Sequence, residues 1–137
     1  MTPSNIWGTH GRGALVALKR DGRPQISVVD YTYDPKSRVL RFSTTDDRAK
    51  TRNLRRDPRA SFYVTGSDAW SYVVGEGTAT VTPVATELND DTVEELIDVY
   101  RAIAGEHPDW DDYRRAMVAD RRLVVRIQIE RVYGPSA

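Results

Sequence analysis

The segment RAKTRNLRRDPRA, residues 48–60, holds five arginines, one lysine and a single acid. The complete chain of 137 residues has 20 basic and 20 acidic side chains, so its formal net charge is zero. So much positive charge in one short segment of a neutral protein indicates either a solvated helix face or a site for an anion.

Charge is distributed unevenly on the two sides of this segment. Residues 1–65 carry 13 basic and 6 acidic side chains, whereas residues 66–120 carry 3 basic and 13 acidic ones. The asymmetry favours a local anion site over a general affinity for nucleic acid, and aromatic residues are scarce between the arginines. We therefore expect no nucleic-acid partner.

Composition and length indicate a globular protein. The length suits one domain, so we expect residues 1–137 to form a single domain with residues 1–12 as a variable N-terminal segment. No run approaches the ~20 apolar residues of a transmembrane helix, and the N-terminus lacks the apolar core of a secretory signal. The absence of cysteine and the presence of only two histidines argue against a thiol nucleophile and a histidine-based metal site. We expect a cytoplasmic protein without a metal or a membrane partner.

Alternating and β-branched segments predict six strands. They cover residues 13–20, 25–33, 38–45, 59–66, 70–83 and 121–134. In the second strand the apolar alternation shifts between Val28 and Val29, which predicts a β-bulge. Gly75 and Gly77 in the fifth strand indicate a bend or the close approach of another backbone.

Three further segments predict helices. The basic segment has a helical pattern over residues 47–56. Asp91 with Glu94 resembles a capping box for a helix that ends at Gly105, and another short helix follows Pro108. Six strands with hairpin turns and few helices favour a mainly β antiparallel barrel over a doubly wound sheet.

One stripe of the basic helix comprises Arg48, Arg52, Arg55 and Arg56, an arrangement typical of a solvated face. Cations near the helix C-terminus suit the helix dipole, which explains Arg55 and Arg56. The spacing of Asp46 and Lys50 also predicts an ion pair.

Arg48 and Lys50 are harder to explain as surface charges, because they lie near the first helical turn, where the dipole disfavours cations. Three hydroxyl residues precede them at a predicted strand end: Ser43, Thr44 and Thr45. Hydroxyls, free amide groups at a helix start and two cations together make a cradle for a phosphate. Neither GxGxxG nor GxxxxGKS/T occurs, which excludes the usual dinucleotide and P-loop arrangements.

The chain resembles the pyridoxamine-phosphate-oxidase-like split β-barrels, and within them the actinobacterial branch that binds coenzyme F-420, an 8-hydroxy-5-deazaflavin. The resemblance covers about residues 13–134. It implies a mainly β, split antiparallel barrel with a few short helices, and a homodimer with two cofactor sites at its interface. The stretches that carry it are DGRPQIS (21–27), YTYDP (31–35), RAKTRNLRRDPRAS (48–61), WSYVVGEG (70–77) and IAGEHPDWDDYRRAM (103–117).

The resemblance also implies which residues bind the cofactor. Ser43, Arg48 and Lys50 match positions that hold the phosphate, with Thr44 and Asn53 beside them. This agrees with the helix-dipole argument, which was made without the family.

Other positions match residues around the ring system and the tail. Gln25 and Ser27 match strand residues along the rings, and Arg122 is a candidate contact for the cofactor tail. The positions that match residues reaching a cofactor bound mainly by the other subunit are Trp70, Ser71 and Tyr72.

The implied function is that of an oxidoreductase, which transfers a hydride from reduced F-420 to a small organic acceptor that the sequence does not identify. The cofactor carries the reactive bond, so no catalytic side chain is assigned. The surplus arginines Arg52, Arg55 and Arg56 suit the acidic polyglutamyl tail of F-420, which favours it over FMN. The alternatives are an FMN-binding oxidoreductase of the same fold and a non-catalytic F-420 carrier.

Overall fold

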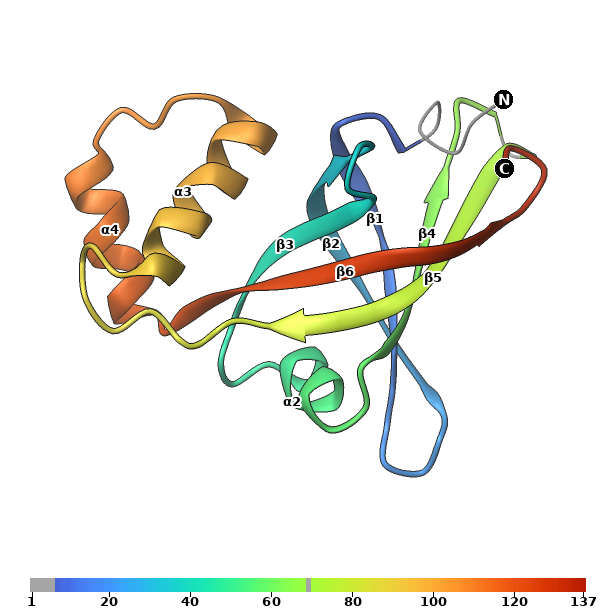
Figure 1. Ribbon diagram of the computed structural model, residues 1–137, viewed down its shortest axis with the longest axis horizontal. Coiled ribbons are helices and arrows are strands. Elements are labelled where there is room, and N and C mark those ends of the chain that lie inside the picture. The colour runs from blue at the N-terminus through green and yellow to red at the C-terminus, as the bar shows by residue number, and fades with distance from the viewer. Residues whose placement is uncertain (1–6, 69) are drawn as a thin grey trace.

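The computed structural model describes residues 7–68 and 70–137. Over these residues six antiparallel strands form a closed barrel, accompanied by three helices (Figure 1). This confirms the mainly β barrel predicted from the sequence. The strands are β1 (His10–Leu18), β2 (Pro24–Asp34), β3 (Val39–Thr45), β4 (Arg59–Thr65), β5 (Tyr72–Val81) and β6 (Arg122–Tyr133), and the helices are α2 (Ala49–Arg56), α3 (Asp91–Ala104) and α4 (Trp110–Ala119).

The barrel is split on one side, between β2 and β3. The strand order is β1-β2-β3-β6-β5-β4, and β1 pairs with β2 along its whole length. The β2–β3 ladder covers only the residues next to their hairpin turn, where Thr32, Tyr33 and Asp34 find partners on β3. Beyond these pairs β3 continues as a partner of β6 alone, which pairs with it from Val39 to Thr45 along its other edge.

Trp7 fills one part of the barrel interior. It is fully buried, and its ring lies 5.5 Å from that of Tyr33 and 5.7 Å from that of Phe62. The hydroxyl of Tyr31 donates to the backbone oxygen of Trp7 at 2.5 Å. The N-terminal segment expected to be variable therefore contributes a core residue.

The two glycines of β5 make the close approaches that the sequence predicts. A Cβ on Gly75 would lie 2.7 Å from the ring of Trp7, and one on Gly77 would lie 2.0 Å from the backbone oxygen of Gln128. Neither position has room for a side chain.

The predicted bulge in β2 was wrong. The register of β1 and β2 runs without a break, and the irregularity falls instead between Glu76 and Gly77 of β5. Ile26 and Val28, whose apolar character produced the apparent shift, face outward and are 64% and 66% exposed. Val29 follows on the inner face, so inward and outward side chains alternate regularly. The unusual feature is that the outward positions 26 and 28 carry apolar residues.

The helices begin and end close to the predicted positions, with one change of cap. The capping residue of α3 is Asp90, whose side chain accepts a hydrogen bond from the backbone N–H of Val93. It replaces the predicted capping box of Asp91 and Glu94. Gly105 ends α3 as expected, with φ of 83°.

The α3–α4 pair packs beside the barrel, next to the start of β6 (Figure 1). Glu95 links α3 to the barrel. Its carboxylate accepts two hydrogen bonds from Arg126 of β6 and lies 3.5 Å from Arg41 of β3. None of the helices in the described part of the chain is long and apolar enough to cross a membrane.

Replacing Trp7 with alanine should destabilise the protein by about 3–5 kcal/mol, because the barrel cannot collapse around so large a cavity. Urea unfolding followed by circular dichroism measures this loss. The control is Leu88→Ala, at an exposed loop position, which should cost less than about 0.5 kcal/mol. Equal losses in the two variants would contradict this role of Trp7.

Candidate cofactor site

The split of the barrel opens into a cavity of about 610 Å³. Its polar side is formed by the end of β3, the start of α2 and the start of β6, which contribute Ser43, Thr44, Thr45, Arg48, Lys50 and Arg122. Its apolar side is formed mainly by α3 and α4, which contribute Val99, Tyr100, Ile103, Tyr113 and Met117. Val28 and Val29 of β2 also line the cavity.

No acid acts on the pKa of Lys50, whereas Arg48 attracts the carboxylate of Asp47, whose pKa it helps to lower. Among the ion pairs of residues 7–68 and 70–137, none involves either side chain. Burial lowers the pKa of Lys50, and the neighbouring charge of Arg48 lowers it further. A partly buried lysine beside an exposed arginine attracts an anion.

The start of α2 adds hydrogen-bond donors to this charge. Its N-cap residue, Arg48, makes no side-chain capping bond, whereas α3 and α4 are capped by Asp90 and Asp109. An uncapped helix start leaves amide N–H groups available to an anion. We call the set of Ser43, Thr44, Arg48, Lys50 and the first turn of α2 the phosphate cradle.

Arg122 completes the cradle from β6. Its Nη1 donates to the hydroxyl of Ser43 at 3.3 Å, while its Nε is buried and has no partner. A buried N–H without an acceptor is costly, so a ligand that supplies one is favoured at this position. Ser43, Thr44, Arg48 and Lys50 thus line one cavity with Arg122, which the resemblance assigns to the cofactor tail. Asn53 lines the neighbouring groove instead.

Gln25 and Ser27 lie on the inward side of β2, beside α2. The side chain of Asn53 in α2 donates to Gln25 Oε1 at 3.4 Å, and the hydroxyl of Ser27 is buried without a partner. Ser27 lines neither the cavity nor the groove beside α2. Asn53 acts as a link between α2 and β2.

A second, basic groove borders α2. It has a volume of about 360 Å³ and is lined by Lys19, Arg20, Gln25, Ala49, Arg52, Asn53 and Arg56. Arg52 and Arg56 donate to the backbone oxygens of Asp47 and Leu18, which are neutral acceptors. None of the lining residues is acidic, so the groove keeps its positive charge.

Comparison with known proteins assigns the chain to a family. The family model of pyridoxamine 5'-phosphate oxidase matches residues 5–134. The chain belongs to this family. It is 30% identical over 120 residues to a biliverdin reductase of Mycobacterium tuberculosis that depends on reduced coenzyme F-420, with coverage of 88% of this chain and 76% of that protein.

Solved structures of the same fold extend the comparison. A protein named F-420 reductase superposes with a TM-score of 0.72 at 21% identity, over 95% of this chain and 94% of that chain. An FAD-binding protein from Mesorhizobium loti superposes with a TM-score of 0.65 at 18% identity, over 94% and 86% of the two chains. These likenesses confirm the fold of the pyridoxamine 5'-phosphate oxidase family.

Three residues that the family resemblance singles out do not join the cradle within this chain. Trp70 is 84% exposed in the turn between β4 and β5. Ser71 donates to Asp68 at 3.0 Å, and the ring of Tyr72 lies 5.6 Å from that of Tyr63. That they reach a cofactor held by another subunit stays a prediction.

The apolar wall from α3 and α4 was missed by the sequence reasoning. Helical spacing of apolar residues reveals an apolar face but does not tell which cavity that face lines. Tyr113 contributes its ring to this wall, and its hydroxyl donates to the backbone oxygen of Leu96 at 3.0 Å. Burial raises the pKa of Tyr113 to about 12, so its phenol keeps its proton at neutral pH.

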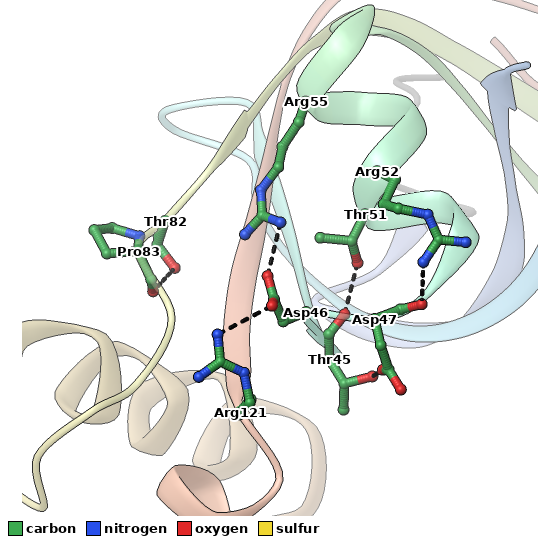
Figure 2. Close-up of polar contacts among 9 residues, drawn as sticks. All are labelled: Thr45, Asp46, Asp47, Thr51, Arg52, Arg55, Thr82, Pro83 and Arg121. Carbon is green, nitrogen blue, oxygen red and sulfur yellow. Dashed lines mark hydrogen bonds and ion pairs between the residues drawn. The ribbon is translucent and has the colours of Figure 1, made fainter. Parts of the chain in front are cut away.

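The predicted ion pair between Asp46 and Lys50 was wrong. Asp46 lies 2.7 Å from Arg55 and 3.1 Å from Arg121 (Figure 2). Arg55 is therefore neutralised and takes no part in the basic groove. Lys50 is left without a carboxylate partner, because Asp46, the acid four residues before it, pairs with these arginines.

Replacing Lys50 with methionine should raise the melting temperature at neutral pH, because the lowered pKa means that the folded state holds the lysine proton less tightly than the unfolded state. Stability of the natural protein should then rise with pH from the folded pKa towards the ordinary value of 10.5. Thermal unfolding of both proteins between about pH 7 and about pH 10 measures the difference, which should shrink as the pH rises. The control is Lys19→Met, at an exposed position, and a lower melting temperature for Lys50→Met would contradict the expectation.

Proposed function

We propose that this protein is an oxidoreductase that binds coenzyme F-420 in the phosphate cradle and uses its reduced form to reduce a small organic acceptor. One observation carries the proposal: Lys50 and Arg48 form no ion pair within the described residues and lie at the uncapped start of α2, in a chain related to an F-420-dependent reductase. A permanently charged anion is the ligand that such an arrangement favours.

The described residues fit the parts of this cofactor. Its phosphate suits Lys50, Arg48 and the Ser43 hydroxyl, and the unpartnered Nε of Arg122 is a further donor for the same end. When bound, F-420 supplies a ring carbon that carries a hydride, and the protein's task is to hold it, orient it and exclude water.

The basic groove supports F-420 over FMN. The F-420 tail is a chain of carboxylates, and Lys19, Arg20, Arg52 and Arg56 offer four cations without a lining acid. FMN has the phosphate but not the acidic tail, so it would leave the groove unused. It remains the second candidate, because the cradle holds a single phosphate equally well from either cofactor.

The apolar wall supports a conjugated and largely apolar acceptor. Tyr100, Ile103 and Met117 face the cavity close to the cradle cations. The mycobacterial relative reduces biliverdin, an extended conjugated molecule. We propose an acceptor of this class, bound against α3 and α4.

The outer face of the barrel supports a homodimer. Val28 of β2, Ala14 of β1 and Tyr63 of β4 stand side by side in register, and Ile26 and Val28 are both strongly exposed. Exposed apolar side chains gathered on one sheet face are typical of an interface. Val28 also lines the cofactor cavity, so a second subunit docked on this face would border the site.

Titration with F-420 and with FMN, followed by tryptophan quenching, tests the cofactor. F-420 should bind more tightly than FMN, and Lys50→Met should weaken both by about tenfold or more, since it removes a charge-assisted phosphate contact. Arg52→Ala should weaken F-420 alone. The matched control is Arg115→Ala, which removes an arginine from an exposed pair on α4 and should change neither affinity.

Two outcomes would redirect the assignment. Tight binding of FMN with no response to F-420 would move the protein to the flavin branch. Binding of F-420 without any oxidation of its reduced form by biliverdin or by simpler conjugated acceptors would favour a carrier over an enzyme.

Replacing Ile26 with aspartate should separate a dimer into monomers, because a charge would be buried at the apolar interface. Light scattering during gel filtration should give the natural protein about twice its chain mass of 15.5 kDa, and the variant the chain mass itself. The control is Leu88→Asp, which adds the same charge at an exposed loop position. A monomeric natural protein would contradict the dimer.

A further inference from the structure

We propose that Asp46 is a positioning residue, which Arg55 and Arg121 hold away from the phosphate cradle so that Lys50 and Arg48 keep their charge for the ligand. The inference rests on the proposed function, since the charge is kept for the phosphate of the cofactor. It gives a role to two arginines that touch neither the cofactor cavity nor the basic groove.

The loop between β3 and α2 carries two acids directly before the helix start. Asp46 and Asp47 directly precede Arg48, the N-cap residue of α2. Acidic side chains are favoured at a helix start, where they accept from free amide groups and neutralise nearby cations. An acid that did so here would compete with the phosphate for the same donors.

Two arginines from different elements prevent this for Asp46 (Figure 2). Arg55, in the last turn of α2, donates to one carboxylate oxygen at 2.7 Å. Arg121, between α4 and β6, donates to the other oxygen at 3.1 Å. The backbone N–H of Asp46 also donates to the backbone oxygen of Arg121 at 3.0 Å, which fixes the loop to the start of β6.

The backbone of Arg121 supports a specific use of its side chain. Its φ is 54°, in the left-handed region that favours glycine. A residue with a side chain is strained in this conformation, because its Cβ approaches the following carbonyl oxygen. An arginine at such a position, directed at Asp46, offsets part of that strain with a charge-assisted hydrogen bond.

Asp47 has hydrogen-bond partners of its own, although its charge still attracts Arg48. Its carboxylate accepts from the hydroxyl of Thr45 at 2.6 Å, and its backbone oxygen accepts from Arg52 at 2.5 Å (Figure 2). Thr51 donates to the backbone oxygen of Thr45 at 2.8 Å, so the loop is fixed from the helix side as well. Both acids of the loop are thus occupied.

The lowered pKa of Lys50 is consistent with both loop acids being directed elsewhere. Its pKa is lowered by burial and by Arg48, and neither loop acid opposes that effect. Without Arg55 and Arg121, the carboxylate of Asp46 would be free to turn towards the nearest cations and the free amide groups of α2. Affinity for an anion would then fall although every residue that touches the ligand is unchanged.

A double-mutant cycle tests the inference, with F-420 as the probe and inorganic pyrophosphate as a second anion. The double variant Arg55→Ala/Arg121→Gly should bind about tenfold more weakly, and glycine suits the backbone at position 121. Adding Asp46→Asn should restore the affinity to within about threefold of the natural protein. Asp46→Asn alone should change it by less than about twofold, so the coupling is large.

The rescue separates this role from a merely structural one. If Asp46 only braces the loop, Asp46→Asn should weaken binding by itself and should deepen the defect of the double variant. A triple variant that binds no better than the double variant would overturn the inference. Thermal unfolding of each variant checks folding, and Arg115→Ala controls for the loss of one positive charge.

The same measurements distinguish this inference from the proposed function. A natural protein that binds pyrophosphate but not F-420, with the full rescue, would leave the diversion of Asp46 standing and remove the cofactor assignment. A natural protein that binds F-420, but with no coupling between Asp46 and the two arginines, would support the cofactor assignment and remove the inference about Asp46. A natural protein that binds neither anion would overturn both.

Discussion

The early divergence of β2 from β3 is the constraint on which the rest of the structure depends. The two strands pair only beside their hairpin turn, at Thr32–Asp34, while β3 pairs with β6 over its whole length on its other edge. The gap that results cannot be closed by another strand. It is bounded instead by α2, which buries Leu54 against the barrel, and by the α3–α4 pair. The cofactor cavity is the space that these helices leave.

The positive charge of the cavity depends on which acids form ion pairs away from it. Asp46 is occupied by Arg55 and Arg121, and Glu95 is occupied by Arg126 and Arg41. Each carboxylate is satisfied by arginines that are not needed for a ligand, while Lys50 stays unpaired. A chain with no net charge thereby builds a strongly positive site. The energetic cost of such a site in the absence of an anion is visible in the lowered pKa of Lys50.

The polar half and the apolar half of the cavity have different proposed roles. The polar half comes from the β3–α2 loop and Arg122, which are fixed by the barrel and by backbone hydrogen bonds. The apolar half comes from α3 and α4, which pack on the barrel through the buried side chains of Leu96, Val93 and Val124. Changes in these helices would alter the wall that faces an acceptor without disturbing the phosphate cradle.

The sequence by itself determined the strands, the close approaches at Gly75 and Gly77, and the chemical types gathered around Arg48 and Lys50. The strands and the charge near the helix start depend on local periodicity and on helix-dipole energetics, which neighbouring residues decide. The glycines indicate that something approaches closely, but the partners, Trp7 and Gln128, come from distant segments. Only the tertiary structure decided the partner of Asp46, the wall formed by α3 and α4, and the outward position of Ile26. Each of these depends on a residue far away in the chain, such as Arg121 for Asp46, and local spacing carries no information about contacts between distant segments.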